Sequence, residues 1–350
     1  MAGIDDVARL AGVSTATVSR ALSGSVKVSD ATRLKVTEAA DALGYVVSSY
    51  ASSLASGRTR NVGAVVPHLN RWFFASVIEG AERALLRRGY DLTLYNLSGG
   101  GEERRTVFER HLLRQRVDAV IAISLELTDE EIGRLLRIGK PLVSVGGPLK
   151  GVRSLSIDDV AVAQLATAHL IALGHRRIAH IGGGREYDLD FHIPTSRRHG
   201  YERALTAAGI PIEPALYRTA DFTIAGGYAA AKQLLGTPGD RPTGIFAASD
   251  EMAIGALLAA RDLGISVPHD VSVVGIDDYE LSEFFGLSTV AQFPGRQGEL
   301  AVDLLMRTLE PSGEHQPDAA SMSSSADAGA TIPVPYELIV RGSTAAPALG

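Results

Sequence analysis

The sequence predicts a small all-α domain at the N-terminus, followed by a larger α/β domain built from two parallel-sheet subdomains. In the first 46 residues, apolar side chains recur at the spacing of short helices. From residue 61 onward, short runs rich in β-branched residues alternate with amphipathic segments, and these runs fall into two series. With 350 residues and 45% hydrophobic content, the chain is long enough for two or three domains. We expect the helical domain at 1–46, a linker at 47–60 and the α/β domain at 61–345.

The composition excludes several classes of protein. The chain has no cysteine, which rules out disulfides, thiolate metal sites and cysteine nucleophiles. We see no signal segment at the N-terminus and no apolar run that approaches the ~18 residues of a membrane span. We therefore expect a cytoplasmic protein with no membrane partner. The formal net charge is −6, but residues 1–60 carry seven Lys or Arg against five Asp or Glu, so the total does not exclude a phosphate-binding patch there.

The N-terminal domain begins with two short helices where one long helix would be simpler. The apolar residues from Ile4 to Ala11 follow the i, i+3, i+4, i+7 pattern of one helical face. Gly12 suits the left-handed end of that helix, and Ser14 suits the cap of the next one. On the second helix the inward residues are Val18, Ala21 and Leu22, and the outward ones are Thr15, Ala16, Ser19 and Arg20.

A third helix completes this small core. It is expected over Asp30 to Leu43, with Ser29 as its cap and Gly44 as its stop. The break between the first two helices exposes the N-terminal end of the second, which then fits a DNA major groove of about 12 Å. Periodicity alone also permits a three-helix bundle that has nothing to do with DNA.

The exact residues favour the DNA-binding interpretation. The segment DVARLAGVSTATVSRALSG strongly resembles the helix-turn-helix of the LacI family of bacterial transcription regulators. The resemblance implies that Thr15 and Ala16 occupy the variable base-reading positions and that Arg20 contacts guanine or phosphate. It further implies that Ser14, Thr17 and Ser19 contact phosphates or cap the helix. Because Thr15 and Ala16 are small, base readout there would rest on methyl contacts and one hydroxyl.

The segment from Tyr45 to Arg60, YVVSSYASSLASGRTR, has too few apolar residues for a core, and by itself it is compatible with a plain linker. In the LacI family this segment is a hinge helix that forms on the operator, and paired hinges push a leucine into the minor groove. The resemblance places Leu54 at that wedge position. Val47, Ser48 and Ser52 stand where the family usually has Pro, Asn and Arg, which makes hinge folding less favourable here.

The α/β domain is predicted from alternating strands and helices. The expected strands are 62–66, 91–95, 118–123 and 141–145 in the first series and 176–181, 244–249 and 271–276 in the second, with helices near 74–88, 102–115 and 251–263 among them. Strands alternating with helices form parallel sheets, and such sheets bind ligands beyond the C-terminal ends of their strands. The residues at those ends are His68, Asn70, Trp72, Phe73, Phe74, Gly146, Gly147, the loop 185–197, Asp221, Phe222, Ser249, Asp250, Asp277 and Asp278.

This set combines aromatic faces, arginine and carboxylates, a mixture that binds a polar ring. Taken one at a time, most of these residues have ordinary structural roles, and we expect Asp250 to cap the helix 251–263. Three further segments, ATAHLIALGHRRIAHIGG, SDEMAIGALLAARDLGISVPHDVSVVGIDD and YELIVRGST, are similar to the LacI effector domain, which resembles the type I periplasmic sugar-binding proteins. The resemblance implies that the effector contacts are Phe73, Phe74, Arg197, Phe222, Ser249 and Asp277.

The resemblance also implies which parts of the chain form each subdomain and what the effector is. We expect the N-terminal subdomain at about 61–158 and 292–320, and the C-terminal subdomain at about 159–291 and 321–342, with 311–330 as a flexible insertion. Family habit favours a sugar as effector, followed by a nucleobase or nucleoside and then an unusual aromatic or acidic metabolite. Gly146, Gly147 and a long loop before Arg197 depart from the family pattern and leave this choice open.

Two classes of function therefore remain. The first is a homodimeric, effector-controlled regulator, most simply a repressor, that binds an inverted-repeat DNA operator. The second is a solute-binding transport protein with a helical head. An enzyme is not expected. The glycine triplets at 99–101 and 182–184 lack a phosphate-loop ending, and the histidines form neither a metal pair nor a Ser-His-Asp set. No cofactor and no metal are expected.

Overall fold

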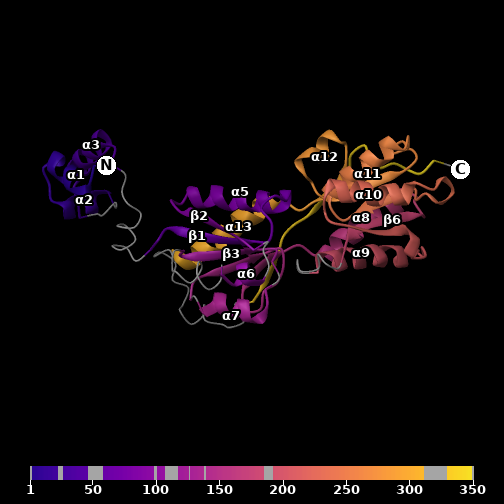
Figure 1. The fold of residues 1–350 in the computed structure, drawn as a ribbon, viewed down its shortest axis with the longest axis horizontal. Coiled ribbons are helices and arrows are strands. Elements are labelled where there is room, and N and C mark those ends of the chain that lie inside the picture. The colour runs from indigo at the N-terminus through magenta and orange to yellow at the C-terminus, as the bar shows by residue number, and fades with distance from the viewer. Residues whose placement is uncertain are drawn as a thin grey trace. The chain divides into compact units, whose positions relative to one another are not determined.

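The computed structural model describes residues 2–22, 27–45, 58–97, 101–106 (backbone only at 101–103), 117–125, 127–137, 139–184, 192–310 and 329–348. Two compact units make up the chain, residues 1–60 and residues 61–350, and each unit is treated separately here. Figure 1 shows the helices of the first unit and the two sheets of the second. No helix in the described ranges is both long and apolar enough to span a membrane.

The first unit contains three helices, α1 (Ile4–Ala11), α2 (Thr15–Leu22) and α3 (Asp30–Leu43), as the sequence predicted. α1 ends at Gly12, whose φ of 67° is left-handed, and α3 ends in the same way at Gly44. The caps are also as expected, because Ser29 accepts a hydrogen bond from the backbone N–H of Thr32. One apolar cluster holds the helices together, formed by Val7, Ala8, Val18, Ala21, Val28, Val36, Ala39 and Ala40.

The second unit contains two six-stranded sheets, which confirms the predicted α/β class. The first sheet has the order β11-β5-β4-β3-β1-β2. Its strands are β1 (Asn61–Val66), β2 (Asp91–Asn96), β3 (Ala119–Ile123), β4 (Leu142–Val145), β5 (Arg153–Ser156) and β11 (Thr331–Pro333), all paired in parallel. Its helices are α5 (Trp72–Leu86), α6 (Gly101–Thr106), α7 (Asp129–Arg137) and α13 (Pro294–Leu309). Of the helix expected near 102–115, residues 107–115 lie outside the described ranges.

The second sheet has the order β12-β10-β9-β8-β6-β7. Its strands are β6 (Ile178–Gly183), β7 (Tyr217–Ala220), β8 (Gly244–Ala247), β9 (Ser272–Asp277), β10 (Ser288–Ala291) and β12 (Glu337–Ile339), and only the β10–β12 pair is antiparallel. Its α-helices are α8 (Asp159–Ala172), α9 (Ile193–Ala207), α10 (Ile224–Leu235), α11 (Asp250–Asp262) and α12 (Glu280–Phe284), with short 3₁₀ turns at Pro214–Leu216 and Pro238–Asp240.

The chain crosses between the two sheets at three places: after β5, after β10 and after β11. One predicted boundary was wrong. We expected all of 321–342 in the C-terminal subdomain, but Thr331–Pro333 pairs with Ser154–Ser156 and so belongs to the first sheet. The physical reason is that β5 would otherwise leave its backbone hydrogen-bonding groups unpaired at the sheet edge.

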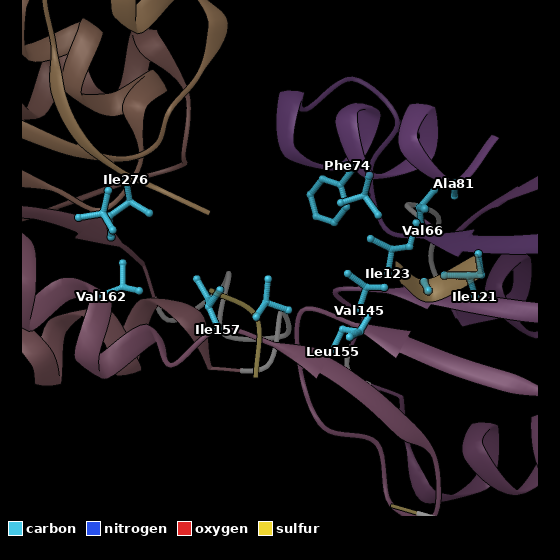
Figure 2. Close-up of a cluster of buried hydrophobic side chains, with 14 of the residues drawn as sticks. Val66, Phe74, Ala81, Ile121, Ile123, Val145, Leu155, Ile157, Val162 and Ile276 are labelled. Carbon is cyan, nitrogen blue, oxygen red and sulfur yellow. The ribbon is translucent and has the colours of Figure 1, made fainter. Parts of the chain in front are cut away.

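The apolar core is continuous across the crossing after β5. One buried cluster contains residues of both sheets, including Val145 and Leu155 from the first and Val162 and Ile276 from the second subdomain. Figure 2 shows Ile157 lying between these two groups. The two sheets therefore meet through packed side chains at this point, and the cavity described below opens beside that contact.

Candidate functional site

The exposed face of α2 is the candidate DNA-binding surface. Ser14 caps the helix, since its Oγ accepts a hydrogen bond from the backbone N–H of Thr17 at 3.1 Å and lies 2.9 Å from the Thr17 hydroxyl. The cap fixes the N-terminal end of the helix in a conformation that leaves Thr15 and Ala16 exposed. Neither residue belongs to the apolar cluster of this unit, so both side chains are accessible to a base edge.

Arg20 completes this face. Its side chain is exposed, and its Nε donates to the carbonyl oxygen of Ala16 one turn earlier at 3.1 Å. Ser19 is exposed as well, and Thr17 is half-buried. Six of the seven predicted DNA-binding residues therefore lie on or beside one helix. The seventh, Leu54, lies outside the described residues, and its wedge role stays a prediction.

The second candidate site is a cavity where the two sheets meet, beyond the C-terminal ends of their strands. All six predicted effector residues line it, three aromatic and three polar. The complete lining is His68, Arg71, Phe73, Phe74, Ser124, Gly146, Ile157, Asp159, Ile193, Pro194, Arg197, Asp221, Phe222, Ser249, Glu251, Asp277, Gln292 and Gln297. Among the other positions predicted at strand ends, Asn70, Trp72, Gly147, Asp250 and Asp278 are not part of this lining.

Two buried ionisable residues, Arg197 and Asp277, give the cavity its polar side. Arg197 is 4% exposed, and it donates from Nε to Asp159 at 2.8 Å and from Nη1 to the carbonyl of Ala248. Burial raises the pKa of Asp159, although the Arg197 charge opposes that shift. On the other wall, Gln292 donates from Nε2 to the Asp277 carboxyl group. Burial raises the pKa of Asp277 to about 8, with Arg197 acting in the opposite direction and Asp250 in the same direction.

A carboxyl group with this pKa is protonated at neutral pH in the cavity without a ligand. Asp277 then offers both a donor and an acceptor, whereas Arg197 offers only donors. Together with the aromatic side chains, the cavity can hydrogen-bond a ring that carries several hydroxyl or amide groups while stacking on its apolar face. Three members of the lining also have positive φ without being glycine: Ser124 (38°), Phe222 (58°) and Asp277 (133°). Such costly conformations often occur at ligand-binding sites.

Several lining residues were missed at the sequence level. Ser124 directly follows β3, so the strand-end rule applied to it as much as to the others. Ile157, Asp159, Gln292 and Gln297 follow β5 and β10, two short strands that the patterns did not reveal. The side chains of Gln292 and Gln297 are buried, and Gln297 donates from Nε2 to the Gln292 carbonyl oxygen at 2.7 Å.

The expected cap of the helix after β8 was also wrong. Ser249 is the N-cap of α11, since its side chain accepts from the backbone N–H of Met252. Asp250 is the first helical residue and is fully buried. Its carboxyl group accepts hydrogen bonds from the Tyr279 backbone N–H at 2.9 Å and from the Ser282 and Thr289 hydroxyls at 2.6 Å each. Asp250 therefore ties α11 to the β9–α12 loop, to α12 and to β10, and it lies between two lining residues, Ser249 and Glu251.

Within the described ranges, no group of three His, Asp or Glu side chains is placed to hold a metal ion. Comparison with known proteins gives matches to both units. Residues 3–48 match the model of bacterial regulatory proteins of the lacI family, and residues 167–344 match that of the periplasmic binding protein-like domain. A curated relative, the HTH-type transcriptional repressor PurR of Vibrio atlanticus (strain LGP32), is 36% identical over 315 residues, which cover 89% of this chain and 92% of that protein.

Two solved structures extend the likeness over nearly the whole chain. A complex of the transcriptional regulator CelR with cellobiose is 34% identical, has a TM-score of 0.68 and covers 98% of this chain and 100% of its own. A lac repressor dimer bound to operator and the anti-inducer ONPF is 26% identical, has a TM-score of 0.81 and covers 99% of each chain. These matches cover both the unit that carries α2 and the unit that carries the cavity, and this chain belongs to the LacI family of bacterial regulatory proteins.

Proposed function

We propose that this protein is a homodimeric transcriptional repressor that binds an inverted-repeat DNA operator through α2 and is controlled by a sugar bound in the cavity. The observation that carries the proposal is the presence, in one chain, of a capped and exposed α2 and a buried polar and aromatic cavity. A solute-binding transport protein would use the cavity but would have no use for the helical unit. No enzymatic step is proposed.

The chemistry of the cavity supports a sugar as effector. Phe73, Phe74 and Phe222 supply apolar faces, and Arg197 and Asp277 supply buried hydrogen-bonding groups. A sugar ring has the matching combination of an apolar face and a rim of hydroxyls. The CelR structure holds cellobiose, which supports the same class of ligand here. A flat nucleobase would use the same aromatic faces, so it belongs in any test panel.

An exposed aromatic surface supports the homodimer. Phe284 on α12 is 84% exposed and its neighbour Phe285 is 39% exposed. An accessible pair of aromatic residues is typical of a protein–protein interface. The lac repressor in its operator complex is a dimer. Two copies of α2 related by a twofold axis would require an operator with the same symmetry.

The proposal is tested by selecting binding sites from random duplexes with the purified full chain. We expect an inverted repeat whose affinity, measured by fluorescence anisotropy, falls steeply with salt at a log–log slope of about −0.9 per neutralised phosphate. Arg20→Ala should weaken binding tenfold or more, on the order of the ~1–3 kcal/mol carried by a base or phosphate contact. Arg261→Ala, which removes an exposed arginine from α11 in the second unit, is the matched control and should bind as the wild type does.

The selected duplex then serves to identify the effector. Cellobiose, ribose, other mono- and disaccharides, and free nucleobases are added one by one to the protein–DNA complex. A sugar that changes the anisotropy supports the proposal. A response to a nucleobase alone would replace the sugar while leaving the repressor intact, and an asymmetric selected site or no selected site would overturn the repressor itself.

A further inference from the structure

Two consecutive residues at the start of α5 reach across the cleft from the first subdomain to the second. Arg71 donates from Nη1 to the carbonyl oxygens of Asp221 and Phe222, at 2.7 Å each, on the loop between β7 and α10. The Trp72 ring lies 5.2 Å from the Tyr279 ring, inclined by 55°, on the loop between β9 and α12. Neither contact includes a residue from the three segments where the chain crosses between the sheets. Both contacts therefore add noncovalent links to the covalent links made by those segments.

The charges around Arg71 favour this position. Its guanidinium faces the second subdomain, where Glu251 at the start of α11 and Asp221 both carry carboxyl groups. Burial raises the pKa of Glu251, the Arg71 charge lowers it and Asp221 raises it further. If Arg71 left this position, its two carbonyl acceptors would lose a charged donor and Glu251 would lose a nearby cation.

We propose that Arg71, Trp72 and Tyr279 form a clasp that holds the two subdomains closed without any ligand. Arg71 supplies two charge-assisted hydrogen bonds to one loop of the second subdomain, and the Trp72 ring contacts the Tyr279 ring on another loop. A cleft held in this way opens only when both contacts break together. The clasp thus sets how much of the protein is closed before a ligand arrives, whatever that ligand is and whether or not the chain binds DNA.

The expected size of the effect follows from the contacts. Removal of the two hydrogen bonds made by Arg71 should raise the ratio of open to closed molecules by about tenfold or more. Lysine at this position would keep the charge, but its compact ammonium lacks the planar fork of arginine and should hold the loop less well. Arg71→Lys should therefore fall between the wild type and Arg71→Ala.

The chain carries its own reporter for this test, because Trp72 is its only tryptophan. Acrylamide quenching of tryptophan fluorescence in the ligand-free full chain measures access to that ring. We expect the quenching constant to rise at least about twofold in Arg71→Ala and in Tyr279→Leu. Tyr279→Phe keeps the aromatic ring and should resemble the wild type. Arg83→Ala, which removes an exposed arginine of α5 that pairs with Glu79 on the same helix, should also resemble it.

A second measurement separates opening of the cleft from local loosening around Trp72. Because the chain has no cysteine, the double variant Leu86→Cys/Arg261→Cys places one spin label on the exposed surface of each subdomain. Labelled protein is diluted with unlabelled protein so that each measured pair lies in one protomer. Electron–electron resonance should show a shift to longer distances when Arg71→Ala or Tyr279→Leu is added. Circular dichroism checks that each variant is folded.

These results decide the proposal. Greater quenching together with a longer distance between the labels supports the clasp. Greater quenching at an unchanged distance means that the contacts are local and overturns it. Unchanged quenching in both Arg71→Ala and Tyr279→Leu also overturns it, since the contacts would then be absent or without effect in solution.

Discussion

Replacement of Asp250 offers the sharpest test of how the cavity is supported. Its carboxyl group is fully buried and accepts from three donors: the Tyr279 backbone N–H, the Ser282 hydroxyl and the Thr289 hydroxyl. These donors belong to the β9–α12 loop, α12 and β10. Asp250→Ala removes the acceptor for all three at once and leaves a buried polar space.

The magnitude follows from the number of donors. A buried donor left without a partner costs about 1–3 kcal/mol. The hydroxyls of Ser282 and Thr289 can rotate toward other acceptors, and a water molecule can enter a polar space, so the three costs are not simply added. A loss of about 3–5 kcal/mol in the free energy of unfolding is the range for breaking a buried charged network. For the second unit, residues 61–350, an unfolding entropy of about 2.1 cal/mol/K per residue converts this loss to a fall in Tm of about 5–8 °C.

The assay is thermal unfolding of the full chain followed by circular dichroism. Asp250→Asn keeps the shape and one acceptor oxygen and should lose about half as much. The matched control is Asp262→Ala, at the other end of α11, where an exposed carboxylate accepts from the Tyr228 hydroxyl at 3.0 Å. The reasoning is refuted if Asp250→Ala unfolds within about 2 °C of that control, because the three hydrogen bonds would then carry no net stability.

Three further predictions concern the cavity wall, pH and the dimer. Gly146→Ala should destabilise the protein by about 2–4 kcal/mol, because the backbone there is left-handed and the added Cβ would lie 1.9 Å from the Ser124 hydroxyl oxygen. Gly151→Ala, whose added Cβ would meet no atom within 4 Å among the described residues, should show the backbone strain alone. Burial raises the pKa of Asp277 from 3.8 to about 8, so between these pH values the folded protein keeps a proton that the unfolded chain releases, and Tm should fall as pH rises from about 4 to 8. Asp277→Asn should flatten this fall, and an equally steep Tm profile in the variant would contradict the assignment. Phe284→Glu should raise the dissociation constant of the homodimer at least tenfold in analytical ultracentrifugation, whereas Leu136→Glu, also an exposed apolar residue, should not.

The fold was predictable wherever one face of an element was apolar and its end carried a specific residue. Gly12 and Ser14 marked the break between α1 and α2, and both behave in the structure as their chemistry suggests. The long buried strands β1 and β3 were visible as apolar runs for the same reason. Strands such as β5 and β11, with three or four residues each, are too short to show a period, and only their pairing partners define them.

The site was predictable only in part, for a related reason. Arg197, Phe222 and Asp277, which line the cavity, were predicted because they match positions in a known family, and Phe73 and Phe74 because they follow a recognisable strand. Asp250 was assigned to the wrong role because a carboxylate at a helix start is usually a cap, and its three donors come from residues 29–39 positions later in the chain. Sequence patterns are local, so they cannot show that such distant donors converge on one carboxyl group.

The positions of Ile157, Asp159 and Gln292 suggest how a ligand in the cavity can act on the arrangement of the two subdomains. Each lies on or directly beside a stretch where the chain passes from one sheet to the other, after β5 or after β10. Each also lines the cavity, and Gln292 holds the carboxyl group of Asp277. A ligand that contacts these residues would therefore act directly on the chain segments that connect the two subdomains. Since Arg71 also lines this cavity, a ligand and the proposed clasp would bias the same equilibrium, and each should alter the apparent strength of the other.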